Sequence, residues 1–287
     1  MGFRTIVVSS NCKLEYSLNY LVYRTIDETK RINIDEINTV IIQSTAMSIT
    51  AALLNELISK KIKVIFCDAK NNPSFELIPY IGDSVSSRRI NEQIMWSQDM
   101  KDLVWQKIVI EKIKNQRLVL EKFNIDGYAL KEFENKVEKG DITNREGHAA
   151  KVYFNRIFGD GFTRNSDSEY NVYLNYGYSI ILSQFNRSIA AKGYLTQLGI
   201  HHKNDFNPFN LASDLMEPFR PIVDDLAHSV NMNDFKDRMI NLLNINVFIG
   251  GQNQTLANAI NIYVASIFRA LNTGAINEIM FFEKYEF

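Results

Sequence analysis

The chain has 287 residues, of which 46% are apolar and 23% are charged, and this ordinary globular mixture excludes disorder over most of the chain. Lysine and arginine together number 32 and aspartate and glutamate 33, so the net charge is −1. A strongly basic nucleic-acid-binding protein is therefore excluded, and any DNA site must be a local patch or must use metal ions or a partner.

Membrane and secretory signals are lacking in this sequence. No apolar run approaches the roughly 20 residues that a membrane-spanning helix needs, and residues 1–10 lack the apolar segment of a secretory signal. Cys12 and Cys67 are too few for a disulfide framework or a zinc ribbon. We therefore expect a cytoplasmic protein that does not enter a membrane.

The first 80 residues predict short strands. Residues 17–19 separate two of these strands and predict a tight hairpin. Residues 47–60 change to helical spacing, with Ala51, Leu54 and Ile58 on one face. This pattern predicts a β-rich region of small sheets with one helix. The predicted strands are 5–8, 13–16, 20–23, 31–34, 39–43, 63–67 and 75–80.

The composition changes near Gly82, and we place a domain boundary within residues 80–88. Residues 83–126 contain neither glycine nor proline, which favours long helices. The polar residues 124–143 predict a short helix with its connections. An apolar stripe at helical spacing follows over residues 174–189. The predicted class is α+β, with a β-rich domain over residues 1–82 and an all-α domain over residues 83–287.

The first candidate for chemistry is the segment 144–150. Thr143 or Asn144 is suited to cap a helix, and Glu146 then shares an apolar face with Tyr153 and Ile157. The carboxylate of Glu146 therefore points toward the expected core. The alternative is a first-turn glutamate that only stabilises the helix dipole.

The second candidate is the pair His201 and His202. Gly199 is expected to end the preceding helix, which would place both histidines on its exit loop. Imidazoles in such a position can bind metal or transfer protons. The alternative is a pair of surface histidines that only make hydrogen bonds.

The third candidate lies within residues 212–221. Asp214 and Glu217 have capping-box spacing, so the simplest alternative is a purely structural helix start. Pro218 is tolerable in a first turn, but Pro221 should bend the helix. Two prolines beside two acids are costly in a helix that serves only for packing.

Together these three segments offer carboxylates and an imidazole at helix ends. Such ligands suit Mg²⁺ or Mn²⁺, and helix N-termini favour phosphate. The combination indicates metal-dependent phosphodiester chemistry. A P-loop, HExxH, GxSxG or dinucleotide fingerprint is absent from the sequence.

Four segments carry a resemblance to a known family: NREGHAAKVYFN, GYSIILSQFNR, GIHHKNDFNPFNLASD and MEPFRPIVD. They resemble the catalytic integrase subunit of CRISPR spacer acquisition, in particular its type II branch. The resemblance implies an N-terminal β domain that forms a homodimer and a helical C-terminal catalytic domain. It also implies a metal-dependent DNA integrase and endonuclease that joins the 3′ ends of a captured duplex to the CRISPR repeat by transesterification.

The resemblance also implies which residues form the site. The family's metal-binding positions correspond to Glu146, His202 and Glu217, with Mg²⁺ or Mn²⁺ as the ion. Glu217 stands where many members have aspartate, so its arm is longer by one methylene. Asp214 matches an acidic position that shapes the site or reaches the metal, and His201 is the alternative imidazole.

The implied partners are double-stranded DNA, a small ferredoxin-like adaptation subunit in a heterohexamer, and the type II effector nuclease. The residues that we expect to contact DNA phosphates are Arg88, Arg89, Arg145, Arg164 and Arg220. Two other functions stay open from the sequence, a stand-alone structure-selective nuclease with the same site and a non-catalytic DNA-binding scaffold.

Overall fold

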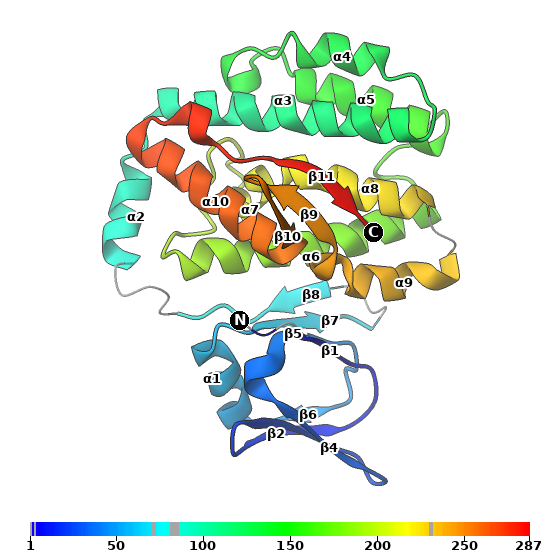
Figure 1. Ribbon diagram of the computed structural model, residues 1–287, viewed down its shortest axis with the longest axis vertical. Coiled ribbons are helices and arrows are strands. Elements are labelled where there is room, and N and C mark those ends of the chain that lie inside the picture. Colours follow the sequence, from blue (N-terminus) through cyan, green and yellow to red (C-terminus); the bar gives the residue numbers. More distant parts are fainter. Residues whose placement is uncertain (1, 3, 70–72, 81–85, 230–231) are drawn as a thin grey trace. The chain divides into compact units, whose positions relative to one another are not determined.

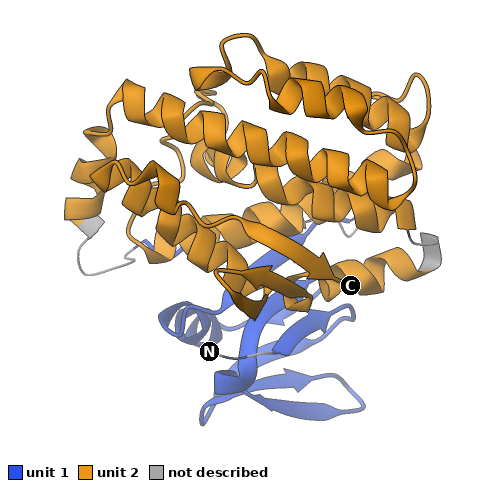
Figure 2. Ribbon diagram, turned by 45° about the horizontal axis from the view of Figure 1, so that its top comes forward, with its two compact units in different colours: residues 1–82 blue, residues 83–287 orange. Residues whose placement is uncertain are grey.

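In a computed structural model of the chain, residues 2, 4–69, 73–80, 86–229 and 232–287 are described. The chain forms two units, Met1–Gly82 and Asp83–Phe287 (Figure 2). Strands dominate the first unit and helices the second, which confirms the predicted α+β class. Residues 81–85, which belong to the predicted boundary segment, lie outside the described residues.

The first unit contains two four-stranded sheets (Figure 1). One sheet has the order β1-β5-β7-β8 and is parallel except for its last strand. The other has the order β4-β3-β2-β6. Their strands are β1 (Arg4–Val8), β2 (Lys13–Ser17), β3 (Tyr20–Arg24), β4 (Thr29–Asn33), β5 (Ile37–Ile42), β6 (Ser48–Ile49), β7 (Lys63–Cys67) and β8 (Pro73–Glu76).

The hairpin expected around residues 17–19 joins β2 to β3. Leu18 and Asn19 form its loop with φ angles of 49° and 66°, the positive values that a two-residue hairpin turn requires. Helix α1 (Ala51–Ser59) begins after Thr50, whose hydroxyl accepts a hydrogen bond from the backbone N–H of Leu53. The helix is shorter than predicted because residues 48–49 pair with β2 instead.

Helices make up most of the second unit. α3 contacts both α4 and α5, and it also contacts α8 and α10 (Figure 1). Ser97 caps the start of α3 and separates it from α2. The helices are α2 (Ser86–Ile94), α3 (Gln98–Lys122), α4 (Tyr128–Glu134), α5 (Arg145–Phe158), α6 (Glu169–Ala191), α7 (Asn210–Leu215), α8 (Arg220–Ser229), α9 (Met232–Ile240) and α10 (Leu256–Thr273).

The prediction of an all-α second domain is wrong, because this unit also holds a three-stranded antiparallel sheet. Its strands β9 (Asn246–Ile249), β10 (Gln252–Thr255) and β11 (Phe282–Glu286) have the order β10-β9-β11. Gly250 and Gly251 form the hairpin turn with φ angles of 58° and 76°. The pair Gly-Gly between short apolar and polar runs is a local hairpin signal, whereas the addition of β11 is a long-range pairing.

The aromatic end of the chain packs on its own unit. β11 pairs with β9, and Phe282 is buried with its ring centroid 5.0 Å from that of Phe219. The hydroxyl of Tyr285 donates a hydrogen bond of 2.6 Å to the buried carboxylate of Asp225. Across the described residues, the helices are too short or too polar to span a bilayer.

Candidate active site

Glu146 lies in the first turn of α5. Asn144 caps this helix with its side-chain oxygen 3.2 Å from the backbone N of Gly147, as predicted. The carboxylate of Asp141 accepts two more N–H groups, from Arg145 at 2.8 Å and from Glu146 at 3.0 Å. Since Asp141 and Asn144 satisfy the first turn, the carboxylate of Glu146 is available for a contact outside its own helix.

Glu217 begins the 3-10 turn η3 (Glu217–Phe219), which lies between α7 and α8. Pro218 and Pro221 interrupt the helical path here, in agreement with the expected bend. The amide of Asn115 donates a hydrogen bond of 2.9 Å to the carbonyl of Pro218 and ties the turn to α3. The side chain of Glu217 is thereby held almost wholly buried, with 5% of its surface exposed.

The two glutamates meet at one cation, the Lys112 ammonium of α3. Lys112 Nζ lies 2.6 Å from Glu146 Oε1 and forms a second ion pair with Glu217 Oε2. The other oxygen of Glu217 lies 2.9 Å from Arg220 Nε. Two carboxylates from separate elements are therefore held at one ammonium, with the guanidinium of Arg220 as a second positive charge beside Glu217.

The electrostatics of this cluster favour its charged form. Burial by itself raises the pKa of Glu217, but the attraction of Arg220 and Lys112 outweighs it, so the pKa lies below its usual value. Burial likewise opposes the charge on Lys112, yet Glu217 and Glu146 raise the pKa of its ammonium. The cluster is a buried ion network, in which loss of one member leaves an uncompensated charge.

His202 is oriented by Asp214, a fully buried residue of α7. Its Nδ1 lies 2.5 Å from Asp214 Oδ1, and a carboxylate can only accept, so Nδ1 carries the proton and donates. This hydrogen bond raises the pKa of His202 against the opposing effect of burial. Nε2 is the ring nitrogen left to bind a ligand, as in the carboxylate–histidine pairs that support metal ions.

The capping-box alternative for Asp214 and Glu217 is wrong. Asp214 lies inside α7, whose N-cap is Phe209. Its carboxylate instead accepts the backbone N–H groups of Ile200 at 2.7 Å, His201 at 3.0 Å and His202 at 3.1 Å. Asp214 thus shapes the histidine loop, which is one of the two roles expected for it.

Gly199 does not end the preceding helix, because α6 stops at Ala191. A Cβ at Gly199 would lie 2.5 Å from the carbonyl oxygen of His202 and 2.8 Å from Asp214 Oδ2. The glycine therefore lets the loop close around Asp214. His201, the alternative imidazole, stacks on Trp105 with ring centroids 4.3 Å apart and planes at 5°.

A divalent ion requires several of these groups at one point. The oxygens of Glu146 and Glu217 contact the same nitrogen atom, so they lie close enough together to bind one cation, and they are the hard ligands that Mg²⁺ and Mn²⁺ prefer. Within the described part of the chain, no three histidine, cysteine or acidic side chains are close enough to hold a metal as placed. Two of the three expected ligands thus fit together, and His202 is aligned separately by Asp214.

The arginines expected at DNA occupy different surroundings. Arg88 is exposed and lies 3.6 Å from Glu92, and Arg89 lies 2.8 Å from the same carboxylate. Arg164 donates to Asn171 and Asn175. Arg145 opens α5 beside Glu146, and Arg220 is half-buried against Glu217 and the ring of Tyr178.

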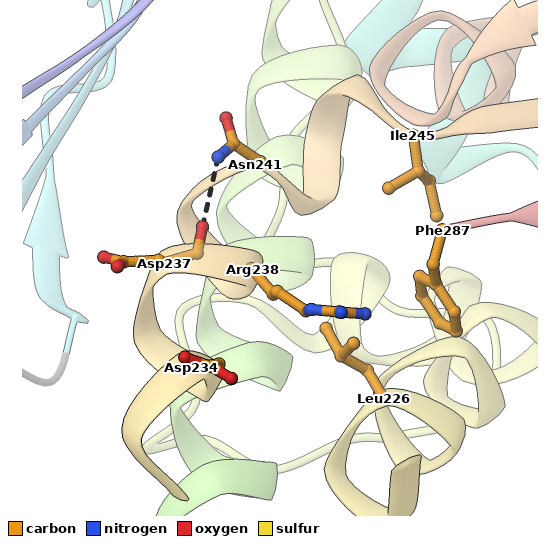
Figure 3. A pocket seen from close by; sticks show the side chains of 7 residues that line it. All are labelled: Leu226, Asp234, Asp237, Arg238, Asn241, Ile245 and Phe287. Atoms are coloured by element: carbon orange, nitrogen blue, oxygen red, sulfur yellow. Dashed lines mark hydrogen bonds between the residues drawn. The ribbon is translucent and has the colours of Figure 1, made fainter. Parts of the chain in front are cut away.

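A pocket of about 850 Å³ includes His202 in its wall. Lys101 and Lys203 bring positive charge to it, and Phe206, which is almost fully exposed, adds an aromatic ring. A second pocket of about 440 Å³ holds none of the predicted site residues (Figure 3). Its lining residues are Leu226, Asp234, Asp237, Arg238, Asn241, Ile245 and Phe287.

Sequence reasoning missed the roles of Lys112 and Asp141. Lys112 follows Trp105 and Ile108 on the buried face of α3, so the helical period places a charged residue where an apolar one is expected. That mismatch is a readable signal of a buried ion pair. Asp141 gave no comparable signal, because its cap depends on the turn that leads into α5.

Comparisons with known proteins agree with one another. The family model described as CRISPR associated protein Cas1 matches residues 5–242. CRISPR-associated endonuclease Cas1 of Neisseria meningitidis serogroup C (strain 8013) is 33% identical over 226 residues, which cover 78% of this chain and 74% of the relative. A similarly named protein of Francisella tularensis subsp. novicida (strain U112) is 27% identical over 228 residues, 71% of each chain.

Solved structures share the fold. A casposase bound to an integration product superposes with a TM-score of 0.77 at 19% identity, over 95% of this chain and 91% of the casposase. A CAS1 protein from Thermotoga maritima gives a TM-score of 0.73 at 17% identity, over 94% and 97% of the two chains. A chain of a Cas6-RT-Cas1–Cas2 complex gives a TM-score of 0.76 at 17% identity, and the match covers 96% of the present chain and 36% of that longer chain.

Proposed function

We propose that this chain, which belongs to the Cas1 family of CRISPR-associated proteins, is the integrase that joins short duplex DNA to a CRISPR repeat. The substrates are the 3′-hydroxyl ends of the captured duplex and a phosphodiester of the repeat. The site is the group of Glu146, Glu217 and His202, and its metal ion is Mg²⁺ or Mn²⁺.

The convergence of Glu146 and Glu217 on one buried point carries this proposal. The two residues come from different elements, and each stands in a segment shaped by other buried groups. A scaffold that only bound DNA would gain little from placing the partly exposed carboxylate of Glu146 beside the buried carboxylate of Glu217, since burying charge is costly.

The reaction is a transesterification. The oxygen of a 3′-hydroxyl attacks phosphorus and loses its proton, a new P–O bond forms, and the bond to the other 3′ oxygen breaks. The leaving oxygen takes up a proton and becomes a 3′-hydroxyl, so the number of phosphodiesters stays the same. A divalent ion, when bound, would neutralise phosphate charge and would lower the pKa of the attacking oxygen. Glu146 and Glu217 would hold the ion, and His202 would offer Nε2 from the orientation that Asp214 imposes.

The surroundings of the site can hold a DNA backbone. Arg145 begins α5 beside Glu146 and Arg220 begins α8 beside Glu217, whereas Arg164 lies in the connection between α5 and α6. Lys101 and Lys203 line the pocket at His202. Contacts of this kind go to phosphates and provide affinity without base recognition. Arg88 and Arg89 extend the basic surface along α2.

We also propose the assembly in which the chain works. Residues 1–82 form the homodimer contact, and a small ferredoxin-like adaptation subunit joins two dimers into a heterohexamer. One structural neighbour is a chain of a Cas6-RT-Cas1–Cas2 complex, which supports an adaptation subunit as a partner of this chain. The type II effector nuclease is the proposed further partner.

A strand-transfer assay tests the function. The protein and its adaptation subunit are mixed with a short 3′-hydroxyl duplex and repeat-containing DNA in Mg²⁺, Mn²⁺ or EDTA. We expect metal-dependent joined product, abolished by Glu146→Ala and by Glu217→Ala. Glu132→Ala is the matched control, since this exposed glutamate pairs with Lys136 on the surface.

Other outcomes discriminate the alternatives. Metal-dependent cleavage without joining identifies a nuclease in which water replaces the 3′-hydroxyl. Joining that survives both substitutions places the active site elsewhere. DNA binding without reaction, by an assembled complex, leaves a scaffold.

A further inference from the structure

We propose that the Lys112 ammonium is a built-in monovalent substitute for the divalent ion, one that neutralises Glu146 and Glu217 until a metal displaces it. This inference rests on the metal-dependent function proposed above. It concerns a residue for which we have so far named no role in the reaction.

The geometry places Lys112 Nζ where a shared cation would lie. The nitrogen is 2.6 Å from Glu146 Oε1 and also pairs with Glu217 Oε2. The side chain retains 8% of its surface exposed. A divalent ion that bound both oxygens from the side where the ammonium lies would take the place of the ammonium, so the two cations compete for this position.

The position of Lys112 in α3 also supports this role. It lies in a stretch where Val109, Ile113 and Gln116 are buried as well. A lysine that only solubilised the helix would face water, and surface lysines do so on the same helix, as Lys114 shows with its more exposed pair to Glu111. The desolvation of Lys112 is offset by the two carboxylates it serves.

Charge balance explains the need for a substitute. If neither the Lys112 ammonium nor a metal ion were present, Arg220 would be the one positive charge beside Glu146 and Glu217 in this cluster, and the two carboxylates would repel each other. Lys112 brings the cluster to neutrality and keeps the oxygens together. Entry of a divalent ion makes the same cluster positive, which favours a DNA phosphate only after the metal has arrived.

Two consequences distinguish this role from a purely structural ion pair. Removal of the ammonium should tighten metal binding, because the ion no longer competes with a bound cation. Removal should also destabilise the metal-free protein, because the buried carboxylate of Glu217 and the partly exposed carboxylate of Glu146 are left with too little positive charge. The loss of stability is shared with a structural ion pair, so the distinction rests on tighter metal binding together with release of the Lys112 amine when metal binds.

The test compares Lys112→Met with the wild-type chain. Mn²⁺ affinity is measured from the electron paramagnetic resonance signal of free Mn²⁺, and thermal unfolding is recorded with and without Mn²⁺. We expect Mn²⁺ to bind about tenfold more tightly or better to the variant, and its lowered Tm to be restored by the metal. Lys114→Met is the control and should change neither quantity.

A second variant and a second measurement guard against misfolding. Lys112→Arg keeps the charge and should not bind Mn²⁺ more tightly than the wild type. In the wild-type chain, the extent of chemical acetylation of Lys112 is measured by mass spectrometry. It should rise when Mn²⁺ is added, since the displaced amine becomes reactive. This measurement decides the question if Lys112→Met does not fold.

The failure of this inference differs from the failure of the function. Wild-type protein that binds Mn²⁺, together with unchanged or weaker binding by a folded Lys112→Met, overturns the substitute role alone. Unchanged labelling of Lys112 in Mn²⁺ overturns it as well. Wild-type protein that binds no Mn²⁺ overturns both the metal-dependent function and the inference.

Discussion

Replacement of Asp214 by asparagine should loosen the histidine loop at a calculable cost. Oδ2 accepts the N–H groups of Ile200 and His201, and Oδ1 accepts the N–H of His202 and its ring Nδ1. An asparagine side chain has one oxygen and one NH₂ group, so as long as Nδ1 of His202 keeps its proton, either orientation leaves two donors facing another donor. Asp214→Asn therefore removes two charge-assisted hydrogen bonds while keeping the shape.

Each such bond contributes about 1.5–3 kcal/mol, so we expect the free energy of unfolding to fall by about 3–6 kcal/mol. Urea unfolding followed by tryptophan fluorescence measures this loss in the unit that contains Asp214, Asp83–Phe287. Both tryptophans, Trp96 and Trp105, lie in residues 83–287, and Trp105 stacks on His201 itself.

Asp205→Asn is the matched control, because Asp205 is an exposed carboxylate of the same loop. It should change the free energy of unfolding by less than about 0.5 kcal/mol. A loss below about 1 kcal/mol in Asp214→Asn would show that the loop does not depend on the buried carboxylate, and our account of how His202 is oriented would have to be abandoned.

Three further predictions concern the same unit. Burial raises the pKa of Asp224 from 3.8 to about 7 despite a hydrogen bond from Tyr178, so the folded state holds this proton more tightly than the unfolded state. Between about pH 4 and 7, Asp224 therefore ionises in the unfolded state but stays protonated in the folded state, and the free energy of unfolding falls by up to ~1.4 kcal/mol per pH unit. Asp224→Asn should remove that part of the slope when urea unfolding is measured as a function of pH. Phe282→Ala should cost about 3–4 kcal/mol in the same experiment, because it deletes a buried ring of β11. Gly199→Ala should cost about 1–3 kcal/mol, because its Cβ would meet the His202 carbonyl oxygen.

Each of these predictions has an outcome that contradicts it. An unchanged pH slope in Asp224→Asn would assign the titration to another group. Phe287→Ala, at an exposed ring of the same tail, should cost much less than Phe282→Ala, and equal losses would argue against the packing explanation. A Gly199→Ala variant as stable as the wild type would mean that the loop has room for a side chain.

Local patterns in the sequence were sufficient for the order of the two units and for several element ends. The hairpin at Leu18 and Asn19 and the cap at Asn144 follow from neighbouring residues alone. The same applies to the interruption near Pro218 and Pro221, since proline acts on its own turn. The sequence also resembled the family to which the chain belongs, and that resemblance is confirmed.

Contacts between distant residues were decided only by the tertiary structure. β11 reaches β9 after the whole of α10, so an all-α domain was predicted where a sheet exists. Spacing suggested that Asp214 caps a helix, but folding brings the backbone of residues 200–202 to its carboxylate. Such donors are not visible in the local pattern around Asp214.

The candidate site was also predictable only in part. Glu146, His202 and Glu217 were predicted from residue type, spacing and resemblance, whereas the ammonium that pairs with the two glutamates was not. Lys112 lies 34 residues from Glu146 along the chain, and no local pattern links the two. A buried charge is stable only where its partners are also buried, and which charges share one buried point depends on how the helices pack.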